Sequence, residues 1–372
     1  MPWPPMDNRL AWRRRLHLTA AIVALFAARL QGAEQSMTDE VKQLLPPHVG
    51  AAVIAIDQEE TIFKQAWGPR RIDQPELLCT PATNFRLASV SKHFTATAVM
   101  LLVDRGQLAL DDTLANVFAD CPDYWQSITV RHVLTHTSGL PDYEDHIPAG
   151  TTLQLSDLNV LAILRDTTEP LFTPGSKFAY SNSGYVLLGL VVEIASGRPF
   201  HEFLRTEVFA PAGMERSVMY VTGVNSIAER AFGHLAADGD PWQLADQSVT
   251  SAVRGDGGVY SSLNDLEKWI AAVQHPGLLS ETSWQAMTTP HVKTDRGDAW
   301  YGYGWFVDEY RGEQRYFHAG DTRGFTLMLQ RFPERRAAVA ILLNRGDIDA
   351  ADEDKYVRQI VDHFLFPANG DE

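Results

Sequence analysis

Short runs of hydrophobic residues with strong β propensity lie close to the two ends of the chain. Residues 51–56 and 61–67 form two such runs separated by four polar residues, which predicts a hairpin. Residues 325–332 and 337–343 repeat this pattern around a Pro-Glu pair. We therefore expect antiparallel strands at both ends of the fold.

The middle of the chain shows helical periodicity instead. Val90, Phe94, Ala98 and Leu101 recur at a spacing that places them on one helix face. Side chains that cap helices, and a glycine that ends one, mark the other boundaries. The expected helices are 90–102 with a stop at Gly106, a short helix capped by Thr129 that ends near His136, 185–195 capped by Ser183, a helix capped by Ser262 with Asp265, and 352–366.

Terminal strands that enclose a helical middle indicate an α+β fold. The antiparallel sheet would be built from N- and C-terminal strands, flanked by helices, with a helical insert at roughly 100–290. No internal repeat or low-complexity tract interrupts this pattern. We expect a leader over residues 1–33 and one globular domain over residues 34–372.

The N-terminus has the order of features of a secretory signal peptide. Arg13, Arg14 and Arg15 precede a mostly apolar run over residues 16–28, and small residues follow at Gly32 and Ala33. The run is shorter than the ~20 apolar residues that span a bilayer. The prediction is an exported bacterial protein, periplasmic or secreted, without a membrane span once the signal is removed. An uncleaved amphipathic anchor is the alternative.

The charge balance excludes one class of partner. The chain carries 47 acidic against 32 basic residues, for a net charge of -15, so its long-range field would repel a nucleic acid. The two cysteines, Cys79 and Cys121, lie far apart and form no C-x-x-C motif, which excludes a zinc ribbon or redox pair. One disulfide and two buried thiols both remain open.

The first candidate for chemistry is Ser89-Val90-Ser91-Lys92, at the start of a predicted helix. Serine is a poor nucleophile until another group accepts its proton, and a lysine three residues later lies on the same helix face. The helix N-terminus and the backbone N–H of Ser89 would also favour a developing oxyanion. By itself the motif is weak, because a serine at a helix start is more often only an N-cap.

Two further candidates follow along the chain. Tyr180-Ser181-Asn182 lies between a Pro-Gly turn and a helix, where the phenol could shuttle protons and the amide could bind a carbonyl. A packed tyrosine ring and a capping asparagine would be the structural alternative. His318-Ala319-Gly320 enters the strand pair at 325–343, and only this position distinguishes it from the H-x-G sequences at 48–50 and 275–277.

Taken in this order, the three elements resemble the penicillin-binding-protein and serine β-lactamase superfamily. The likeness is to the branch of class C β-lactamases, D-Ala-D-Ala carboxypeptidases and related esterases, and it covers nearly the whole of the chain after the leader. Further stretches resemble that branch at residues 132–140, 174–182, 257–262 and 301–305.

The resemblance implies a β-lactamase/transpeptidase-like fold and a role for each motif. Ser89 would be the acylated nucleophile, Lys92 its activating partner and Tyr180 the proton shuttle. Asn182 would bind the acyl-side amide of the substrate. The substrate would lie along the strand edge from His318 to Gly320, and we include Asp321 and Arg323, which follow this motif, among the expected substrate-binding residues.

His318 departs from the β-lactamase pattern, in which a lysine usually occupies this position. Histidine, with a reference pKa of ~6.5, is mostly neutral at pH 7, so it does not supply the lysine's permanent cation. This puts the binding of a carboxylate-bearing β-lactam in doubt. Arg323 is close enough in sequence to replace the charge, although a solvent-facing loop residue is an equal interpretation.

We therefore expect a serine hydrolase that cleaves a small ester or amide through a covalent acyl-serine intermediate. The alternatives are a D-amino-acid carboxypeptidase, a weak class C-like β-lactamase, and a noncatalytic protein that binds peptidoglycan or β-lactams. The expected partner is a small ester, amide or peptide, and we expect no cofactor or metal. His132 and His136 have the i, i+4 spacing of zinc ligands but lack the glutamate of a metalloprotease helix.

Two other segments have open interpretations. The acidic loop with Asp142, Glu144 and Asp145 is expected to be a solvated face. The aromatic residues at 300–305 could line a cleft or pack in the core, and the glycines between them favour an extended backbone that approaches its neighbours closely.

Overall fold

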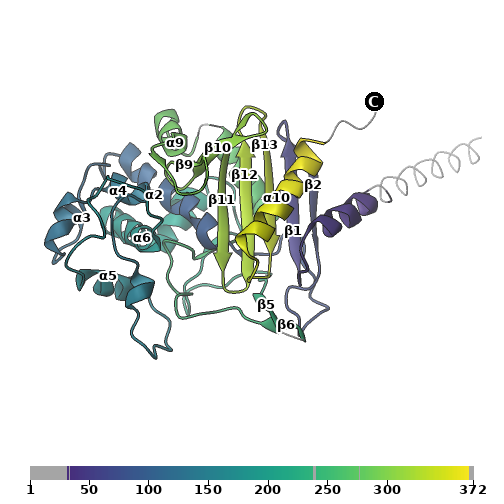
Figure 1. Ribbon diagram of the computed structural model, residues 1–372, viewed down its shortest axis with the longest axis horizontal. Coiled ribbons are helices and arrows are strands. Elements are labelled where there is room, and N and C mark those ends of the chain that lie inside the picture. The colour runs from purple at the N-terminus through teal and green to yellow at the C-terminus, as the bar shows by residue number, and fades with distance from the viewer. Residues whose placement is uncertain (1–31, 33, 238–239, 276, 368–372) are drawn as a thin grey trace, which may run out of the picture.

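The computed structural model describes residues 32, 34–237, 240–275 and 277–367 (Figure 1). The predicted leader lies outside the described residues, except for Gly32. Within the described part of the chain, no helix is both long and apolar enough to cross a membrane.

An eight-stranded antiparallel sheet forms the centre of the fold. Its strand order is β2-β1-β13-β12-β11-β10-β9-β8, so the N-terminal hairpin joins the C-terminal strands through β1 and β13, with Ala51 opposite Leu343. The expected α+β fold with a sheet closed by distant strands is confirmed. The strands of this sheet are β1 Ala51–Asp57, β2 Glu60–Trp67, β8 Val292–Lys293, β9 Trp300–Tyr301, β10 Phe306–Tyr310, β11 Glu313–Thr322, β12 Phe325–Phe332 and β13 Ala337–Leu343.

Helices and two small sheets make up the rest. The α-helices are α2 Lys92–Asp104, α3 Leu114–Val117, α4 Val130–Leu134, α5 Asp157–Arg165, α6 Asn182–Ser196, α7 Phe200–Phe203, α8 Leu263–Gln274, α9 Glu281–Thr288 and α10 Ala350–Leu365. The other helical segments are the 3₁₀ helices η1 Ala88–Ser91, η2 Asp123–Ser127 and η3 Tyr143–His146, and the π-helix η4 Leu204–Phe209. The small sheets contain β3 Phe85–Arg86, β7 Val259–Ser261 and β4 Val218–Met219, and β5 His234–Ala237 with β6 Asp240–Leu244.

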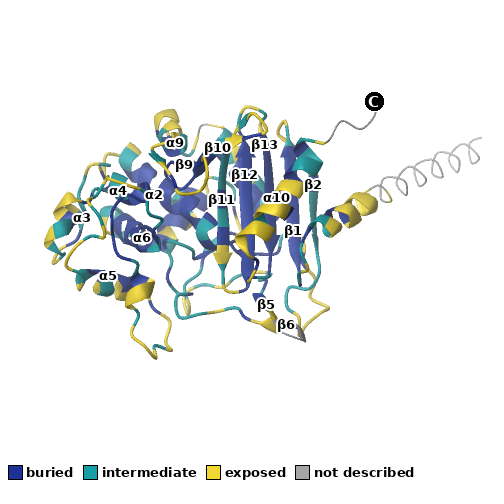
Figure 2. Ribbon diagram, in the orientation of Figure 1, coloured by how far each residue is buried: buried dark blue, intermediate teal, exposed yellow. Residues whose placement is uncertain are grey.

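The sheet separates two hydrophobic cores. On one face, α10 and a helical segment at residues 34–44 cover side chains of β1, β12 and β13 (Figure 1). The other face of the sheet packs against α2, α6 and α8 and forms a larger core with them. Figure 2 shows that α2 and α6 are mostly buried, whereas the outer surface of α10 is exposed. Both faces of β1 and β13 are therefore buried, which explains why their sequences are continuous hydrophobic runs.

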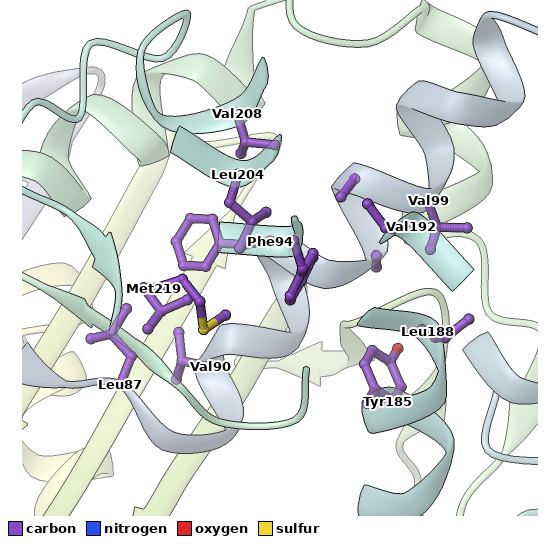
Figure 3. Packing of buried hydrophobic residues seen from close by; sticks show 14 of the residues in the cluster. Leu87, Val90, Phe94, Val99, Tyr185, Leu188, Val192, Leu204, Val208 and Met219 are labelled. Atoms are coloured by element: carbon purple, nitrogen blue, oxygen red, sulfur yellow. The ribbon is translucent and has the colours of Figure 1, made fainter. Parts of the chain in front are cut away.

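Helix α2 runs through the middle of the larger core. Phe94 is fully buried, with its ring 5.3 Å from that of Phe209 and 4.6 Å from that of Trp269. Leu87 and Val90, which flank Ser89, point into the same cluster near Met219 (Figure 3). This packing anchors the segment that carries the Ser-x-x-Lys motif.

Some expected boundaries shift in the structure. The predicted caps at Thr129 and Ser262 are confirmed, because each side chain accepts a hydrogen bond from the backbone three residues later. The cap at Ser183 is wrong: Ser181 caps α6, and the Ser183 hydroxyl accepts a hydrogen bond from Tyr143 N instead. The middle region is also not purely helical, because β3, β4 and β7 lie within or beside it.

Candidate active site

Ser89 lies in η1, the short turn that joins β3 to α2. Ala88, directly before it, has a φ of 44°, a left-handed conformation that is unusual for a residue with a side chain. Val259 of β7 holds the turn on both sides: its carbonyl accepts from Leu87 N at 2.8 Å, and its N–H donates to Ser91 Oγ at 3.1 Å. The second serine of the motif is thus structural, and Ser89 is left half-exposed.

Lys92 is the first residue of α2 and is fully buried. Its Nζ donates to Ser89 Oγ at 3.0 Å, to Asn182 Oδ1 at 2.9 Å and to the Asp256 carbonyl at 2.9 Å. An ammonium group has three protons, so these acceptors satisfy it completely. The expected pairing of Ser89 with Lys92 is thus present in the structure, and Asn182 joins the same cluster.

Tyr180 faces the cluster from the loop before α6. Its ring centre lies 5.0 Å from Lys92 Nζ and 4.3 Å from the ring centre of His136. His136 shapes this loop, because its Nδ1 accepts from Ser181 N at 3.0 Å and its carbonyl accepts from Ala179 N at 2.9 Å. The structure therefore assigns His136 a positioning role, which the sequence spacing with His132 did not suggest.

Strand β11 forms the opposite wall of the site. Its pairing with β10 ends where Phe306 lies opposite Phe317, so residues 318–322 have no β10 partner and present a free edge. At Gly320, a Cβ atom would lie 2.4 Å from the Leu87 carbonyl and 3.3 Å from Val90. Glycine is required there because the strand crosses directly over the turn that holds the nucleophile. An extended substrate could add to this edge as a strand.

His318 is buried and uncharged. Burial lowers its pKa to about 3, and the neighbouring cation Lys92 contributes to this shift. Its Nδ1 lies 2.6 Å from the Ala319 carbonyl and its Nε2 lies 3.2 Å from Tyr301 Oη. Since a carbonyl only accepts, Nδ1 carries the proton and Nε2 accepts from the phenol. His318 therefore supplies no cation to a substrate carboxylate.

Asp321 and Arg323 are not brought into the cluster. Asp321 alternates with Gly320, so it lies on the other face of β11, where its carboxylate accepts from Thr326 Oγ1 at 3.3 Å. Arg323 lies exposed in the turn between β11 and β12. A cation that does lie beside the site is Arg296 of the β8–β9 loop, whose guanidinium lies 5.6 Å from the Tyr180 ring and 4.7 Å from the Phe306 ring. No motif surrounds Arg296, so nothing in the sequence singled it out.

Carboxyl groups approach the cluster from the opposite direction. Asp256 follows the chain turn at Gly255, and burial raises its pKa, while Lys92 and Arg86 oppose that shift. Glu144 of η3 lies near the Asn182 amide; desolvation and the charges of Asp142 and Asp256 raise the pKa of Glu144, while the amide opposes that shift. Glu144 and Asp145 are both exposed, so the expectation that this acidic loop is a solvated face is confirmed for them.

The remaining candidates are structural. His132 Nδ1 accepts from Thr129 N at 3.2 Å within the cap of α4. Cys79 and Cys121 are free thiols, and burial raises the pKa of Cys79 to about 12. Three aromatic residues of the 300–305 segment, Tyr301, Tyr303 and Trp305, pack in the protein interior. Trp300 is 40% exposed.

A comparison with models of known protein families shows to which family this chain belongs. The family model described as Beta-lactamase matches residues 39–362, which include every residue of the cluster. The chain belongs to the beta-lactamase family. The predicted superfamily and the predicted class of serine hydrolase are confirmed by this match.

Relatives of this beta-lactamase family member are named penicillin-binding protein and D-aminopeptidase. It is 28% identical over 334 residues to penicillin-binding protein 4* of Bacillus subtilis, covering 84% of this chain and 72% of that one. It is 25% identical over 323 residues to the D-aminopeptidase of Gluconobacter oxydans, covering 86% of this chain but only 59% of the relative's length. The crystal structure of a penicillin-binding protein from Bacillus halodurans superposes with a TM-score of 0.75 at 28% identity, covering 88% of this chain and 98% of that one.

Proposed function

We propose that this protein hydrolyses small amides or peptides of D-amino acids, with Ser89 as the acylated nucleophile and with a preference for substrates that have a free amino group. The observation that carries the proposal is the buried Lys92, whose Nζ donates to Ser89 Oγ at 3.0 Å and to Asn182 Oδ1 at 2.9 Å. The exposed Glu144, near the Asn182 amide, supports the preference for a free amino group. The preference for the D configuration rests on the names of the relatives, a D-aminopeptidase among them.

The residues of the cluster would act in a fixed order. The substrate carbonyl carbon lies at Ser89 Oγ, which attacks it as its proton passes to the coupled Lys92 and Tyr180 pair. The same pair returns the proton to the leaving amine when the C–N bond breaks. A water molecule then attacks the acyl carbon while one of its protons passes to the same pair. The bond between that carbon and Ser89 Oγ breaks, the proton returns to Oγ, and the carboxylic acid product leaves. The backbone N–H of Ser89 and the positive N-terminal end of the helix would stabilise the oxyanion during both acylation and deacylation.

Asn182 and Glu144 together define the acyl side of the substrate. The Asn182 side-chain carbonyl is occupied by Lys92, at 2.9 Å from Nζ, so its NH₂ group is the part that remains for a ligand. A substrate carbonyl could accept from that NH₂ group, and an ammonium on the adjacent carbon would then lie within reach of the Glu144 carboxylate. Such a pairing is a charge-assisted hydrogen bond of the stronger kind.

The strand residue at the site disfavours a β-lactam. A penicillin presents a carboxylate, whereas β11 offers the neutral His318 where β-lactamases usually have a lysine. The strand therefore supplies no permanent cation to pair with that carboxylate. We therefore place β-lactamase activity behind amide hydrolysis.

Substitution of Glu144 tests the acyl-side assignment. Glu144→Gln should lower kcat/KM for D-phenylalanine p-nitroanilide by about tenfold or more, because a hydrogen bond to a charged group contributes about 1.5–3 kcal/mol. N-acetyl-D-phenylalanine p-nitroanilide, which has no ammonium, should be hydrolysed slowly and equally by both proteins. Asp145→Asn, which removes a charge from the same turn, is the matched control and should behave as wild type.

The same assay decides the substrate class. Faster turnover of nitrocefin, or of the L-phenylalanine anilide, than of the D-phenylalanine anilide would contradict the proposed function. An equal loss on the free and acetylated anilides in Glu144→Gln would contradict the role of Glu144 alone.

A D-amino-acid carboxypeptidase is the second candidate, and Arg296 favours it. The guanidinium lies over Tyr180 at the open side of the site, where it could bind the C-terminal carboxylate of a peptide. Release of D-alanine from acetyl-D-Ala-D-Ala at a higher kcat/KM than hydrolysis of D-alanine amide would favour this candidate over the first.

A noncatalytic binding protein is disfavoured by the completeness of the cluster. A binder needs no buried lysine with three acceptors at a serine hydroxyl, because burial of a charged amine is costly and must be compensated. The arrangement is typical of proton transfer.

We also propose that the protein is exported, supported by the arginine-rich start and apolar run over residues 13–28. Expression of the full chain in a Gram-negative host should release a periplasmic form whose N-terminus, read by mass spectrometry, lies near residue 34. A cytoplasmic form of full mass would contradict export.

A further inference from the structure

A cavity lies outside the catalytic cluster, where α8 and α9 pack against the end of β12. It has a volume of about 340 Å³ and is lined by residues of both helices and of β11 and β12. Figure 1 shows α9 beside β9 and β10, at the side of the sheet where the helical region begins. The residues that characterise this cavity are Gln274, Trp284, Thr288, Tyr316, Arg331 and Pro333.

Arg331 is buried in the wall of this cavity without a counter-ion. Its side chain is 3% exposed, and burial lowers its pKa to about 10. The guanidinium has five N–H donors, yet its one hydrogen bond to a described residue runs from Nη2 to Gln274 Oε1 at 2.6 Å. No carboxylate of the described chain lies within ion-pair distance of it.

A second buried arginine of the same sheet shows how such a charge is normally satisfied. Arg315 of β11 pairs with Asp308 through two hydrogen bonds of 2.8 and 2.6 Å and donates to Gln330 at 3.1 Å. Arg331 has no comparable carboxylate partner among the described residues; its guanidinium lies 5.9 Å from the centre of the Trp305 ring. A buried cation without an anion is costly, so its retention needs a compensating group.

The other residues that line the cavity indicate which kind of ligand could compensate the charge of Arg331. Trp284 also lines the cavity, and its indole Nε1 is buried without an acceptor among the described residues. Trp284, Tyr316 and Pro333 add aromatic and apolar surface next to it. Glu281 is the acidic residue of the lining, but it is exposed at the start of α9 and forms no ion pair with Arg331.

We propose that this cavity is a binding site for a small organic carboxylate, whose charged group pairs with Arg331 and whose apolar body lies against Trp284 and Tyr316. A carboxylate matches the planar fork of a guanidinium through two parallel hydrogen bonds. The site is separate from Ser89 and does not depend on the proposed function.

Benzoate is the probe, and benzamide, with the same shape and no charge, is its control. We expect benzoate to bind the full-length protein with a millimolar Kd by calorimetry and to raise its melting temperature, while benzamide does neither. Arg331→Met should weaken benzoate binding at least about tenfold, the loss expected for a charge-assisted pair. Its unliganded stability should equal or exceed that of wild type, because an uncompensated buried charge is removed.

Arg296→Met is the matched control, because it removes the arginine beside the catalytic cluster and should leave benzoate binding intact. If Arg296→Met abolished binding and Arg331→Met did not, the carboxylate would bind at the catalytic site and the proposal would fail. Equal binding of benzamide would also overturn it. Should Arg331→Met not fold, 4-iodobenzoate soaked into wild-type crystals gives an independent answer: an iodine peak between α8 and α9 is expected, and its absence there contradicts the site.

Discussion

Replacement of Ser89 by alanine should abolish covalent labelling by a fluorophosphonate and lower kcat for the D-phenylalanine anilide by at least about 10³-fold. Ser89 Oγ is the hydroxyl that Lys92 Nζ contacts, at 3.0 Å, and it lies half-exposed at the free edge of β11. Removal of one oxygen from this position leaves the packing of Leu87 and Val90 in place, so the melting temperature should change little.

Ser91→Ala provides the matched control, since it removes the same atom two residues away. Ser91 is fully buried and its Oγ accepts from Val259 N, so this variant should lose stability by about 1–3 kcal/mol while it keeps its labelling. The assignment of the nucleophile would be wrong if Ser89→Ala retained wild-type turnover, or if Ser91→Ala lost labelling at full stability.

Loss of Lys92 or Tyr180 should slow acylation far more than it weakens binding. Free lysine and tyrosine, with reference pKa values of ~10.4 and ~10, are both protonated at pH 7, so neither accepts a proton without help. The structure places Lys92 Nζ 5.0 Å from the centre of the Tyr180 ring and 3.0 Å from Ser89 Oγ, so both side chains are positioned to take part in the same proton transfer. We expect losses of about 10²–10⁴-fold in each single variant, the range of general acid–base catalysis.

The double variant distinguishes a coupled pair from two independent groups. Lys92→Met keeps the length of the side chain in its buried site, and Tyr180→Phe keeps the ring packed against His136. The double variant should be barely slower than the slower single one, because residues that act as a unit are not additive. Pre-steady-state acylation from pH 5 to 10, with melting temperatures as the control, measures this. Single losses under tenfold that multiply in the double variant would exclude the coupled mechanism.

Local patterns in the sequence were enough to predict most of the framework. The runs at 51–56, 61–67, 325–332 and 337–343 match four strands to within a residue. In β1 and β13, burial on both faces demands uninterrupted hydrophobic residues, whereas β2 and β12 also carry polar side chains. Thr129 and Ser262 predicted helix starts through a bond that spans three residues. Such signals need no knowledge of distant contacts.

Boundaries that depend on competition between neighbours were less predictable. Ser181 and Ser183 are both good capping residues, and the choice between them is made by Tyr143, whose N–H engages the Ser183 hydroxyl from another part of the chain. The short strands β3, β4, β8 and β9 have no periodicity of their own, because two residues are too few to show one.

The sequence by itself determined the fold class, the family resemblance and the three motifs, because each depends on residues that lie within a few positions of one another. Only the tertiary structure decided which charges surround them. Arg296 and Glu144 reach the cluster from separate loops, and Asp321, adjacent to the motif, points away because side chains alternate across a strand. Electrostatic interactions act through space rather than along the chain, so the charges that would select a substrate emerged only when distant segments were brought together.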